Sequence, residues 1–300
     1  MIDTSKWEDY FYGTAQLACG AVSVKYKGMA QFIGSAVYIA PGLFITAKHV
    51  VEDPLSKVGI TKQIHENKMY GQLDGNFKTN EFIIEVVQML KIEARIAQRW
   101  NINKFSYSHD LDLAILTADF TDGPISKLVG SLPNVSINIH PYPKINRVVS
   151  YGFYGNSVDN DDGTATTHTL SFQGRVGKIL DFHQDIASIA GMAVYELDNK
   201  IEHMMSGGAV CNDDGAVIAI NSSSIEPEEV NGRNRTICTP IIRAMYLKFD
   251  YKINGNYINT SLYELAQTGY IEVIGIEHLS LAEESIIWSP NKDCKYCYPD

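Results

Sequence analysis

The sequence predicts an all-β protein whose strands form two halves, and three observations support this. Short apolar, β-branched runs separated by Gly, Asn and Asp dominate the chain, as is typical of proteins with many short strands. The breaks have turn chemistry, as at Lys27-Gly28 and Pro41-Gly42. A stretch rich in Pro, Asn and Ser over residues 130–144 separates two groups of runs. Strands at such intervals suggest sandwiches or barrels, with the boundary near residues 121–145.

Each predicted strand is an apolar run between turn signals. Asn212-Asp213-Asp214-Gly215 is a hairpin turn between two of these runs. The strands are expected over residues 21–27, 30–40, 43–51 and 113–117 in the first half, and over 147–154, 169–182, 193–197, 209–211, 216–222 and 237–242 in the second.

Two regions depart from this pattern. Residues 52–107 form a long polar segment in which apolar residues of 80–100 recur at helical spacing. Their β-branched content is equally compatible with strands, so the pattern leaves helix and strand open. In the tail, residues 260–268 predict a short helix, with Thr260 or Ser261 as the N-cap and Gly269 as the stop.

Composition excludes several classes of protein. With 45% apolar and 20% charged residues among 300, the chain can bury a full core and is not disordered. The formal net charge of −10 argues against a nucleic-acid partner, because an acidic surface repels phosphates. No apolar stretch is long enough for a membrane span. The five cysteines and the lack of a signal-peptide pattern lead us to expect a cytoplasmic protein with free thiols.

Three segments carry residues suited to nucleophilic catalysis. Ser206 precedes Gly207 and Gly208, which permit tight backbone around a nucleophile and leave N–H groups free for an oxyanion. His49 ends an apolar run, and Asp112 begins one, where a carboxylate can orient an imidazole. Taken singly, each has a plainer explanation: a glycine-rich turn, a structural histidine and a turn aspartate.

Taken together, these segments resemble the trypsin/chymotrypsin-like family of serine peptidases. The resemblance is carried by Thr46-Ala47-Lys48-His49, by the Asp-Leu-Ala-Ile-Leu frame of residues 112–116, and by Ser206-Gly207-Gly208, in the order His, Asp, Ser. Residues 32–37 resemble the strand that precedes the histidine in bacterial members. The resemblance extends over about residues 20–248.

This resemblance implies a chymotrypsin-like fold of two six-stranded antiparallel β-barrels, with an inserted segment in the first barrel and a C-terminal extension. The site would lie between the barrels. The domains implied are an N-terminal extension over 1–19, a first barrel over 20–130 that carries His49 and Asp112, a second barrel over 131–250 that carries Ser206, and a C-terminal extension over 251–300.

The resemblance also implies a serine endopeptidase that acts on protein substrates without a cofactor or metal. Ser206 would be the nucleophile and His49 the general base and then acid. Asp112, rather than Asp110, would fix the imidazole tautomer, because the Leu-Ala-Ile-Leu frame follows it directly. The backbone N–H groups of Met204 and Ser206 would form the oxyanion hole.

Substrate-binding residues follow from the same resemblance. Asn221, Ser222, Ser223 and Ser224 match the wall of the primary pocket, where Ser222 would support the buried aspartate. Ser223 and Ser224 would pair with the substrate main chain as an added strand. Lys200 lies six residues before the nucleophile, near the pocket floor. With no acid there, we expect a small, polar or acidic side chain before the cut, not Arg or Lys.

Two departures from the family pattern are informative. Met204 stands where the family has Gly, and its side chain restricts the loop that forms the oxyanion hole. Met205 replaces the aspartate that binds a freed N-terminus, so zymogen cleavage of that kind is not expected. Met204 also supports the alternative function, a catalytically silent, protease-like binding protein.

We further expect that a partner or ligand gates the activity, because an unrestrained endopeptidase would harm the cytoplasm. Residues 52–107 and the tail exceed what two minimal barrels need and would be docking surfaces. The alternative is that both are tolerated insertions in a very selective enzyme. Cys294-x-x-Cys297 has only half the ligands of a zinc site, so free thiols are expected there.

Overall fold

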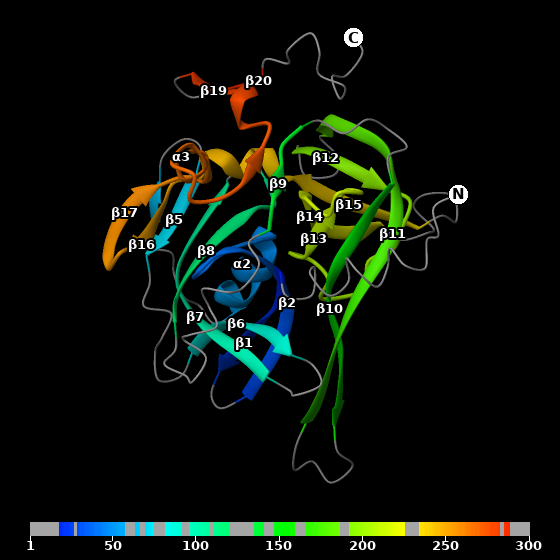
Figure 1. Ribbon diagram of the computed structural model, residues 1–300. Helices are drawn as coiled ribbons and strands as arrows, with labels where there is room; N and C mark the ends of the chain where they lie inside the picture. The colour runs from blue at the N-terminus through cyan, green and yellow to red at the C-terminus, as the bar shows by residue number, and fades with distance from the viewer. Residues whose placement is uncertain are drawn as a thin grey trace.

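The computed structural model confirms an all-β protein built from two closed barrels (Figure 1). Within the ranges that it describes, no helix has the length and apolar character to cross a membrane. The ranges described are 18–26, 29–57, 64–66, 70–74, 82–91, 96–108, 111–120, 135–140, 147–159, 166–186, 192–225, 234–282 and 285–288.

The first barrel closes when β7 pairs with both β6 and β8, in the order β7-β6-β1-β2-β3-β8. Its strands are β1 (Cys19–Tyr26), β2 (Met29–Ala40), β3 (Leu43–Thr46), β6 (Phe82–Lys91), β7 (Ile96–Ser108) and β8 (Ala114–Phe120). All these pairs are antiparallel. The segment left open between helix and strand is thus two strands of the barrel wall. Among the described residues, the hairpin of β4 (Ile64–Glu66) and β5 (Tyr70–Asp74) is the part of this sheet added beyond β7.

The second barrel closes in the same way, when β13 pairs with β14, in the order β13-β10-β11-β12-β15-β14. Its strands are β10 (Arg147–Asp159), β11 (Thr166–Ile186), β12 (Met192–Leu197), β13 (Ala209–Cys211), β14 (Val217–Ile225) and β15 (Arg235–Pro240). Two short strands extend this sheet beyond β14: β9 (Ile137–Asn138) and, from the tail, β18 (Val273–Ile274), both in parallel pairing.

One predicted strand is too long. The run expected as a strand over 43–51 is β3 only as far as Thr46, and helix α2 (Lys48–Lys57) follows it. Val50 N donates to Ala47 O at 3.2 Å, which begins the helical turn. Apolar residues continue past the end of β3 because one face of α2 is buried in the core. Val51 and Leu55, four residues apart, both lie on that face. A short apolar run in the sequence does not distinguish a buried strand from the buried face of a helix.

The tail lies against both barrels (Figure 1). Tyr251 Oη donates to Pro41 O of the first barrel at 2.7 Å, while β18 joins the second sheet. The predicted tail helix is confirmed as α3, with Ser261 as N-cap and Gly269 at φ +71° after its end. The tail comprises η3 (Ile241–Tyr246), β16 (Phe249–Ile253), β17 (Asn256–Thr260), α3 (Leu262–Gln267), β18, η4 (Ile276–His278), β19 (Leu279–Ala282) and β20 (Ser285–Trp288).

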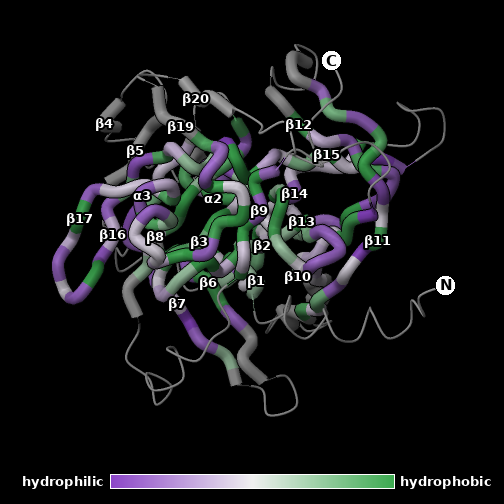
Figure 2. Tube along the Cα trace, turned by 45° about the horizontal axis from the view of Figure 1, so that its top comes forward, coloured by the Kyte–Doolittle hydropathy of each residue, from purple (hydrophilic) through white to green (hydrophobic). Residues whose placement is uncertain are grey.

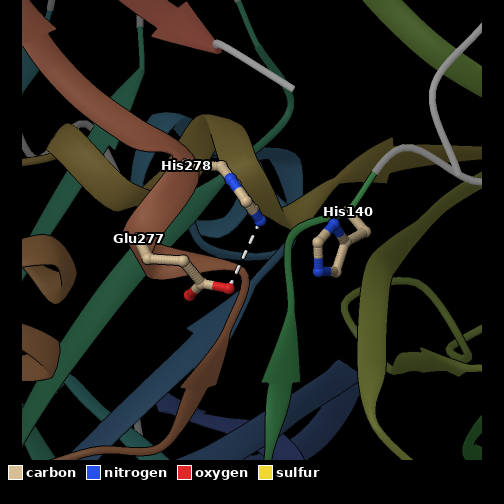
Figure 3. A group of neighbouring side chains, drawn as sticks. All are labelled: His140, Glu277 and His278. Carbon is tan, nitrogen blue, oxygen red and sulfur yellow. Dashed lines mark ion pairs between the residues drawn. The ribbon is translucent and has the colours of Figure 1, made fainter. Parts of the chain in front are cut away.

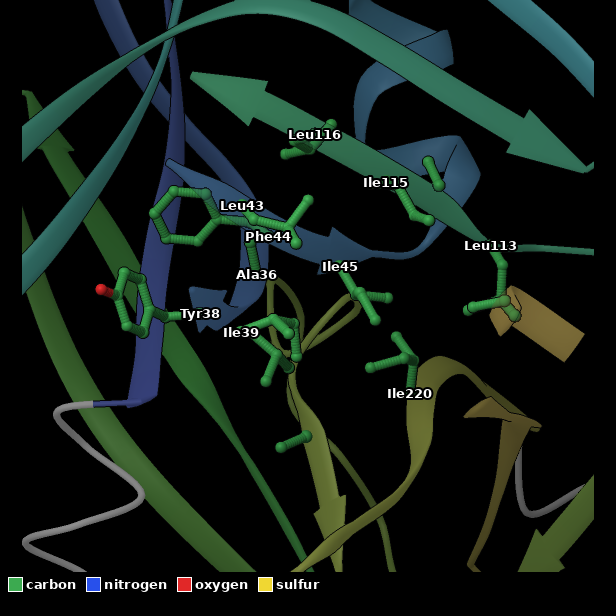
Figure 4. Packing of buried hydrophobic residues seen from close by; sticks show 14 of the residues in the cluster. Ala36, Tyr38, Ile39, Leu43, Phe44, Ile45, Leu113, Ile115, Leu116 and Ile220 are labelled. Atoms are coloured by element: carbon green, nitrogen blue, oxygen red, sulfur yellow. The ribbon is translucent and has the colours of Figure 1, made fainter. Parts of the chain in front are cut away.

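The main apolar core runs from the first barrel across to the second. Apolar segments gather in the interior of both barrels (Figure 2). In the first barrel, Trp100 packs edge-on against Phe44 with ring centroids 5.6 Å apart, and its Nε1 donates to Gln88 Oε1 at 3.1 Å. Ile220 of β14 belongs to the same cluster as Ile45 of β3 (Figure 4). The barrels are therefore joined by apolar packing.

The described cysteines are free thiols, as predicted. Cys19, Cys211 and Cys238 are all buried. Burial raises the pKa of the Cys19 thiol to about 12, so this residue stays protonated. Cys294 and Cys297 lie outside the described residues.

We expect Ile39→Ala to lower the free energy of unfolding by about 2–5 kcal/mol, because a fully buried side chain would leave a cavity. Ile258→Ala is the matched control: this residue is 41% exposed, and its loss should cost about 0.5 kcal/mol or less. Urea unfolding measures both. Equal losses would contradict the placement of Ile39 in the core.

Candidate active site

The pairing of β3 with β8 brings the predicted histidine and aspartate together. Thr46 pairs with Ala114 in this antiparallel ladder, so residues just after Thr46 face residues just before Ala114. His49 lies in the first turn of α2 and Asp112 lies two residues before β8. The apolar strands around them therefore bring these two polar side chains together.

His49 and Asp112 form a double contact. His49 Nδ1 lies 2.8 Å from Asp112 Oδ2, and the backbone N–H of His49 donates to Asp112 Oδ1 at 3.0 Å. The hydroxyl of Ser222 donates to the same carboxylate, as the resemblance implied. Asp110 lies outside the described residues. Because Nδ1 is engaged by Asp112, the other ring nitrogen, Nε2, is left for chemistry.

The electrostatics of this pair favour an imidazolium beside a carboxylate. Burial by itself would lower the pKa of His49, but the hydrogen bond and charge of Asp112, with the charge of Asp53, raise it above 6.5. Burial by itself would raise the pKa of Asp112, but the hydrogen bonds and charge of His49 and the Ser222 hydroxyl hold it below 3.8. Each residue stabilises the charged form of the other.

Ser206 occupies a turn that both barrels hold. Its carbonyl accepts from Ser35 N of β2 at 2.8 Å, and Gly207 N donates to Asn221 O at 2.7 Å. Gly207 has φ +85°, and a Cβ there would lie 2.0 Å from Ser35 O. A Cβ on Gly208 would lie 2.0 Å from Tyr151 O. The two glycines after Ser206 are thus demanded by close backbone packing, beyond what a plain turn requires.

The Ser206 side chain lies near His49 but does not bond to it here. Ser206 Oγ donates to the carbonyl of Ser222 at 2.7 Å. Both Ser206 and His49 line one cavity of about 400 Å³, together with Phe32, His203 and others. A rotation about the Cα–Cβ bond of Ser206 changes where the hydroxyl points without moving the backbone.

Met204 adopts the conformation that normally favours glycine. It has φ +75°, within a turn closed by Met205 N donating to Glu202 O at 3.1 Å. A non-glycine residue in this region costs about 1–3 kcal/mol. The first barrel supports it, since Ser35 Oγ donates to Met204 O at 2.9 Å. Within the described part of the chain, the N–H groups of Met204 and Ser206 donate to no protein acceptor.

The residues predicted to form the primary substrate pocket differ in burial and in the groups that they contact. Asn221 is buried, and its Nδ2 donates to Tyr151 O at 3.0 Å and to Met205 O at 3.4 Å, so it supports the turn that carries Ser206. Ser222 and Ser223 line a second cavity of about 380 Å³ that also contains His49. Ser224 Oγ donates to Ile201 O at 2.9 Å.

Lys200 is exposed and lines neither of these two cavities. The structure thus brings Ser222 and Ser223 to the cavity that contains His49, whereas Ser224 and Lys200 line neither of the two cavities.

Ser35 is part of the site although its sequence pattern does not predict this. This fully buried serine accepts from Phe153 N at 2.9 Å and donates to Met204 O. The only signal was its position in the segment that resembles the strand before the histidine, which does not reveal a contact 169 residues away along the chain.

Comparison with known proteins identifies one matching family. The family described as "Trypsin-like peptidase domain" matches residues 34–220, which include His49, Asp112 and Ser206. No curated protein matches the sequence.

Solved structures resemble this chain at low sequence identity, and Deg5 shares its fold. Deg5 is 14% identical with a TM-score of 0.50, over 81% of this chain and 92% of its own. The active form of the Rv3671c protease from M. tuberculosis is 13% identical with a TM-score of 0.47, over 81% and 84%. The HtrA-type protease AlgW with a decapeptide is 12% identical with a TM-score of 0.46, over 90% and 76%.

The geometry predicts that the pKa of His49 depends on Asp112. We expect Asp112→Asn to bring this pKa down, because the carboxylate that raises it is removed while burial, which lowers it, remains. Titration of the ring protons by NMR measures the change. Asp53→Asn is the control: it removes a charge without a hydrogen bond, so its effect should be smaller. An unchanged pKa in Asp112→Asn would contradict the pairing.

Proposed function

The chain belongs to the family of trypsin-like peptidase domains, and on this premise we propose that it is a serine endopeptidase that cuts protein substrates with a Ser-His-Asp triad. One observation carries the proposal: His49 Nδ1 lies 2.8 Å from Asp112, and the same imidazole shares a cavity with Ser206. A nucleophile, a base and a group that orients the base are the three parts that acyl transfer needs.

In this mechanism Ser206 Oγ attacks the scissile carbonyl while His49 Nε2 takes its proton. Asp112 holds the Nδ1–H tautomer and stabilises the imidazolium that forms. The N–H groups of Met204 and Ser206, which have no protein acceptor among the described residues, bind the oxyanion. His49 then protonates the leaving amine, and water releases the acyl group from Ser206 by the reverse sequence.

The mechanism requires the Ser206 hydroxyl to turn from Ser222 O toward His49. This exchanges one hydrogen bond for another, so its net cost is small compared with the roughly 1 kcal/mol that a single hydrogen bond contributes. Side-chain rotations of this kind are fast, and catalytic hydrogen bonds often form only when substrate is present. The observed Ser206–Ser222 contact is thus compatible with a resting state of an active enzyme.

The edge of β14 provides a place for an extended peptide. Pairing of β14 with β13 ends at Ile220, while on its other side β14 pairs with β15 as far as Ile225. Among the described residues, Ser222–Ser224 therefore offer one open edge, and Ser222 and Ser223 line the cavity that contains His49. A substrate strand added there would place a main-chain N–H on Ser222 O. That N–H would compete with Ser206 Oγ and favour its rotation toward His49.

The bond from Ser224 Oγ to Ile201 O supports a preference for a small side chain before the cut. In the resemblance Ser224 belongs to the wall of the primary pocket, and Lys200, the residue before Ile201, lies near its floor. A hydroxyl that bonds at 2.9 Å to the residue after Lys200 leaves little depth between wall and floor. We therefore propose a small residue at this substrate position and disfavour Arg and Lys.

The catalytically silent binding protein is the second candidate function. The absence of a Ser206–His49 hydrogen bond in the described structure favours it. It would use the same open edge of β14 to hold a peptide without cutting it.

Control by a partner or ligand remains part of the proposal, as does a cytoplasmic location. If a gate worked by turning a backbone carbonyl into the oxyanion hole, that carbonyl would accept a hydrogen bond from the Ser206 N–H. The Ser206 N–H has no acceptor among the described residues, so this kind of gate has no support. A gate that acts on the Ser206 rotamer is better supported. Fast turnover of a peptide ester by the purified chain alone would rule out an obligatory partner.

We expect Ser206→Ala and His49→Ala each to lower kcat by about 10⁴–10⁶, because the triad acts as a unit. A fluorophosphonate probe should label the wild type and not Ser206→Ala. Ser136→Ala, at a serine that bonds to Glu272, is the control and should label normally. Absence of labelling in the wild type would support the binding protein instead.

A peptide library should show cleavage after small side chains at least about 10-fold faster than after Arg or Lys, since a pocket without depth excludes long side chains. Ser224→Gly should reduce this discrimination, because it removes the hydroxyl that joins Ser224 to Ile201. Wild-type cleavage chiefly after Arg or Lys would refute the pocket assignment.

A further inference from the structure

The tail returns to the strand between the two barrels and brings two distant segments together. Ile137 N donates to Glu272 O and Ile139 N donates to Ile274 O, both at 3.1 Å. These bonds continue the parallel pairing of β9 with β18. As a result His140, just after β9, lies beside the 3₁₀ turn η4, which carries Glu277 and His278.

Three side chains at this junction point toward one another. One potential ligand atom from each of His140, Glu277 and His278 lies within 4.8 Å of the others. His278 Nε2 is 3.3 Å from Glu277 Oε1, and the two imidazole centroids are 5.5 Å apart at an interplanar angle of 54°. Figure 3 shows the two rings and the carboxylate facing a common space.

The backbone is shaped to place the His140 ring. Gly275, the residue before η4, has φ +92°, and a Cβ there would lie 3.1–3.3 Å from three atoms of that ring. Glycine thus permits both the reversal of the chain and the close approach of the imidazole. On the other side, His140 N donates to Asn138 Oδ1 at 3.0 Å, which fixes the turn after β9.

We propose that His140, Glu277 and His278 bind a divalent transition-metal ion, with Zn²⁺ as the best fit. Two histidines and one carboxylate are a ligand set that zinc uses, with water in the fourth position. Ligands about 2.0–2.1 Å from zinc at tetrahedral angles lie about 3.3–3.4 Å apart, and the Nε2–Oε1 distance is already 3.3 Å.

An ion pair between His278 and Glu277 involves two of the three groups. The third, the imidazole of His140, is held within 4.8 Å of both, and Gly275 leaves room for its ring. Side-chain exposure is 16% for His278 and 65% for Glu277, so the site is open to an incoming ion and its water.

A bound ion would fasten the tail to β9, which in turn pairs with β14. The ligands are brought together only in the folded chain, so binding would stabilise the native state. None of the three residues lines either cavity that contains His49. The inference therefore does not rest on the proposed peptidase activity, and its test does not need that activity.

Zinc titration calorimetry of the full chain tests the site, with His140→Ala, His278→Ala and Glu277→Gln as variants. Loss of an outer-shell partner weakens metal sites by about 10–100-fold, so loss of a ligand should weaken this one by at least about 100-fold. His183→Ala, which removes a histidine paired with Glu196 at 2.9 Å, is the matched control and should bind as the wild type does. Zinc bound elsewhere stays in every variant, so the difference between variants is the measured quantity.

Thermal unfolding gives a second readout and shows whether each variant folds. With zinc at about 100 times its Kd, the wild type and His183→Ala should gain about 4 °C over the same protein in chelator. His140→Ala and His278→Ala should keep their chelator Tm and gain nothing from zinc. Zinc binding and a zinc-dependent Tm that persist in both variants, or are missing in the wild type, would overturn the proposal.

Discussion

One buried hydroxyl connects the two barrels at the place where the chemistry is proposed. Ser35 Oγ has one hydrogen, which it donates to Met204 O, and lone pairs, one of which accepts from Phe153 N. The backbone N–H of the same residue donates to Ser206 O. A strand of the first barrel thus fixes the turn of the second barrel that carries Ser206, the proposed nucleophile. The docking of the barrels therefore helps to hold the shape of that turn, and replacement of Ser35 would leave buried polar groups unpaired.

The same clamp explains how Met204 is tolerated at φ +75°. A strained backbone conformation persists only where several surrounding interactions hold it in place. Here the Glu202–Met205 turn bond, the Ser35 hydroxyl and the two bonds between Asn221 and Gly207–Gly208 all act on one short segment. These bonds hold Met204, which stands where the family has Gly, in a backbone conformation that normally favours glycine.

Most strands could be predicted from the sequence, as could the proximity of His49 to Asp112 and to Ser206, because both depend on local patterns: apolar runs between turns, and residue frames around these three residues. The junction of β3 and α2 could not be predicted, because a single apolar run forms first a strand and then the buried face of a helix. Ser35 and the His140–Glu277–His278 cluster could not either. Their partners lie more than a hundred residues away in the chain, and only the register of paired strands brings them together.

The position of β18 as the outermost strand of the second sheet has a consequence for synthesis of the chain. Residues 273–274 leave the ribosome after all other strands of that sheet, so β9 keeps an uncovered edge until then. Uncovered edges can pair with other chains, and nascent domains pass through this state while translation continues. The tail that covers β9 also contacts the first barrel through Tyr251. A pause late in translation would therefore expose both barrels to misassembly at once.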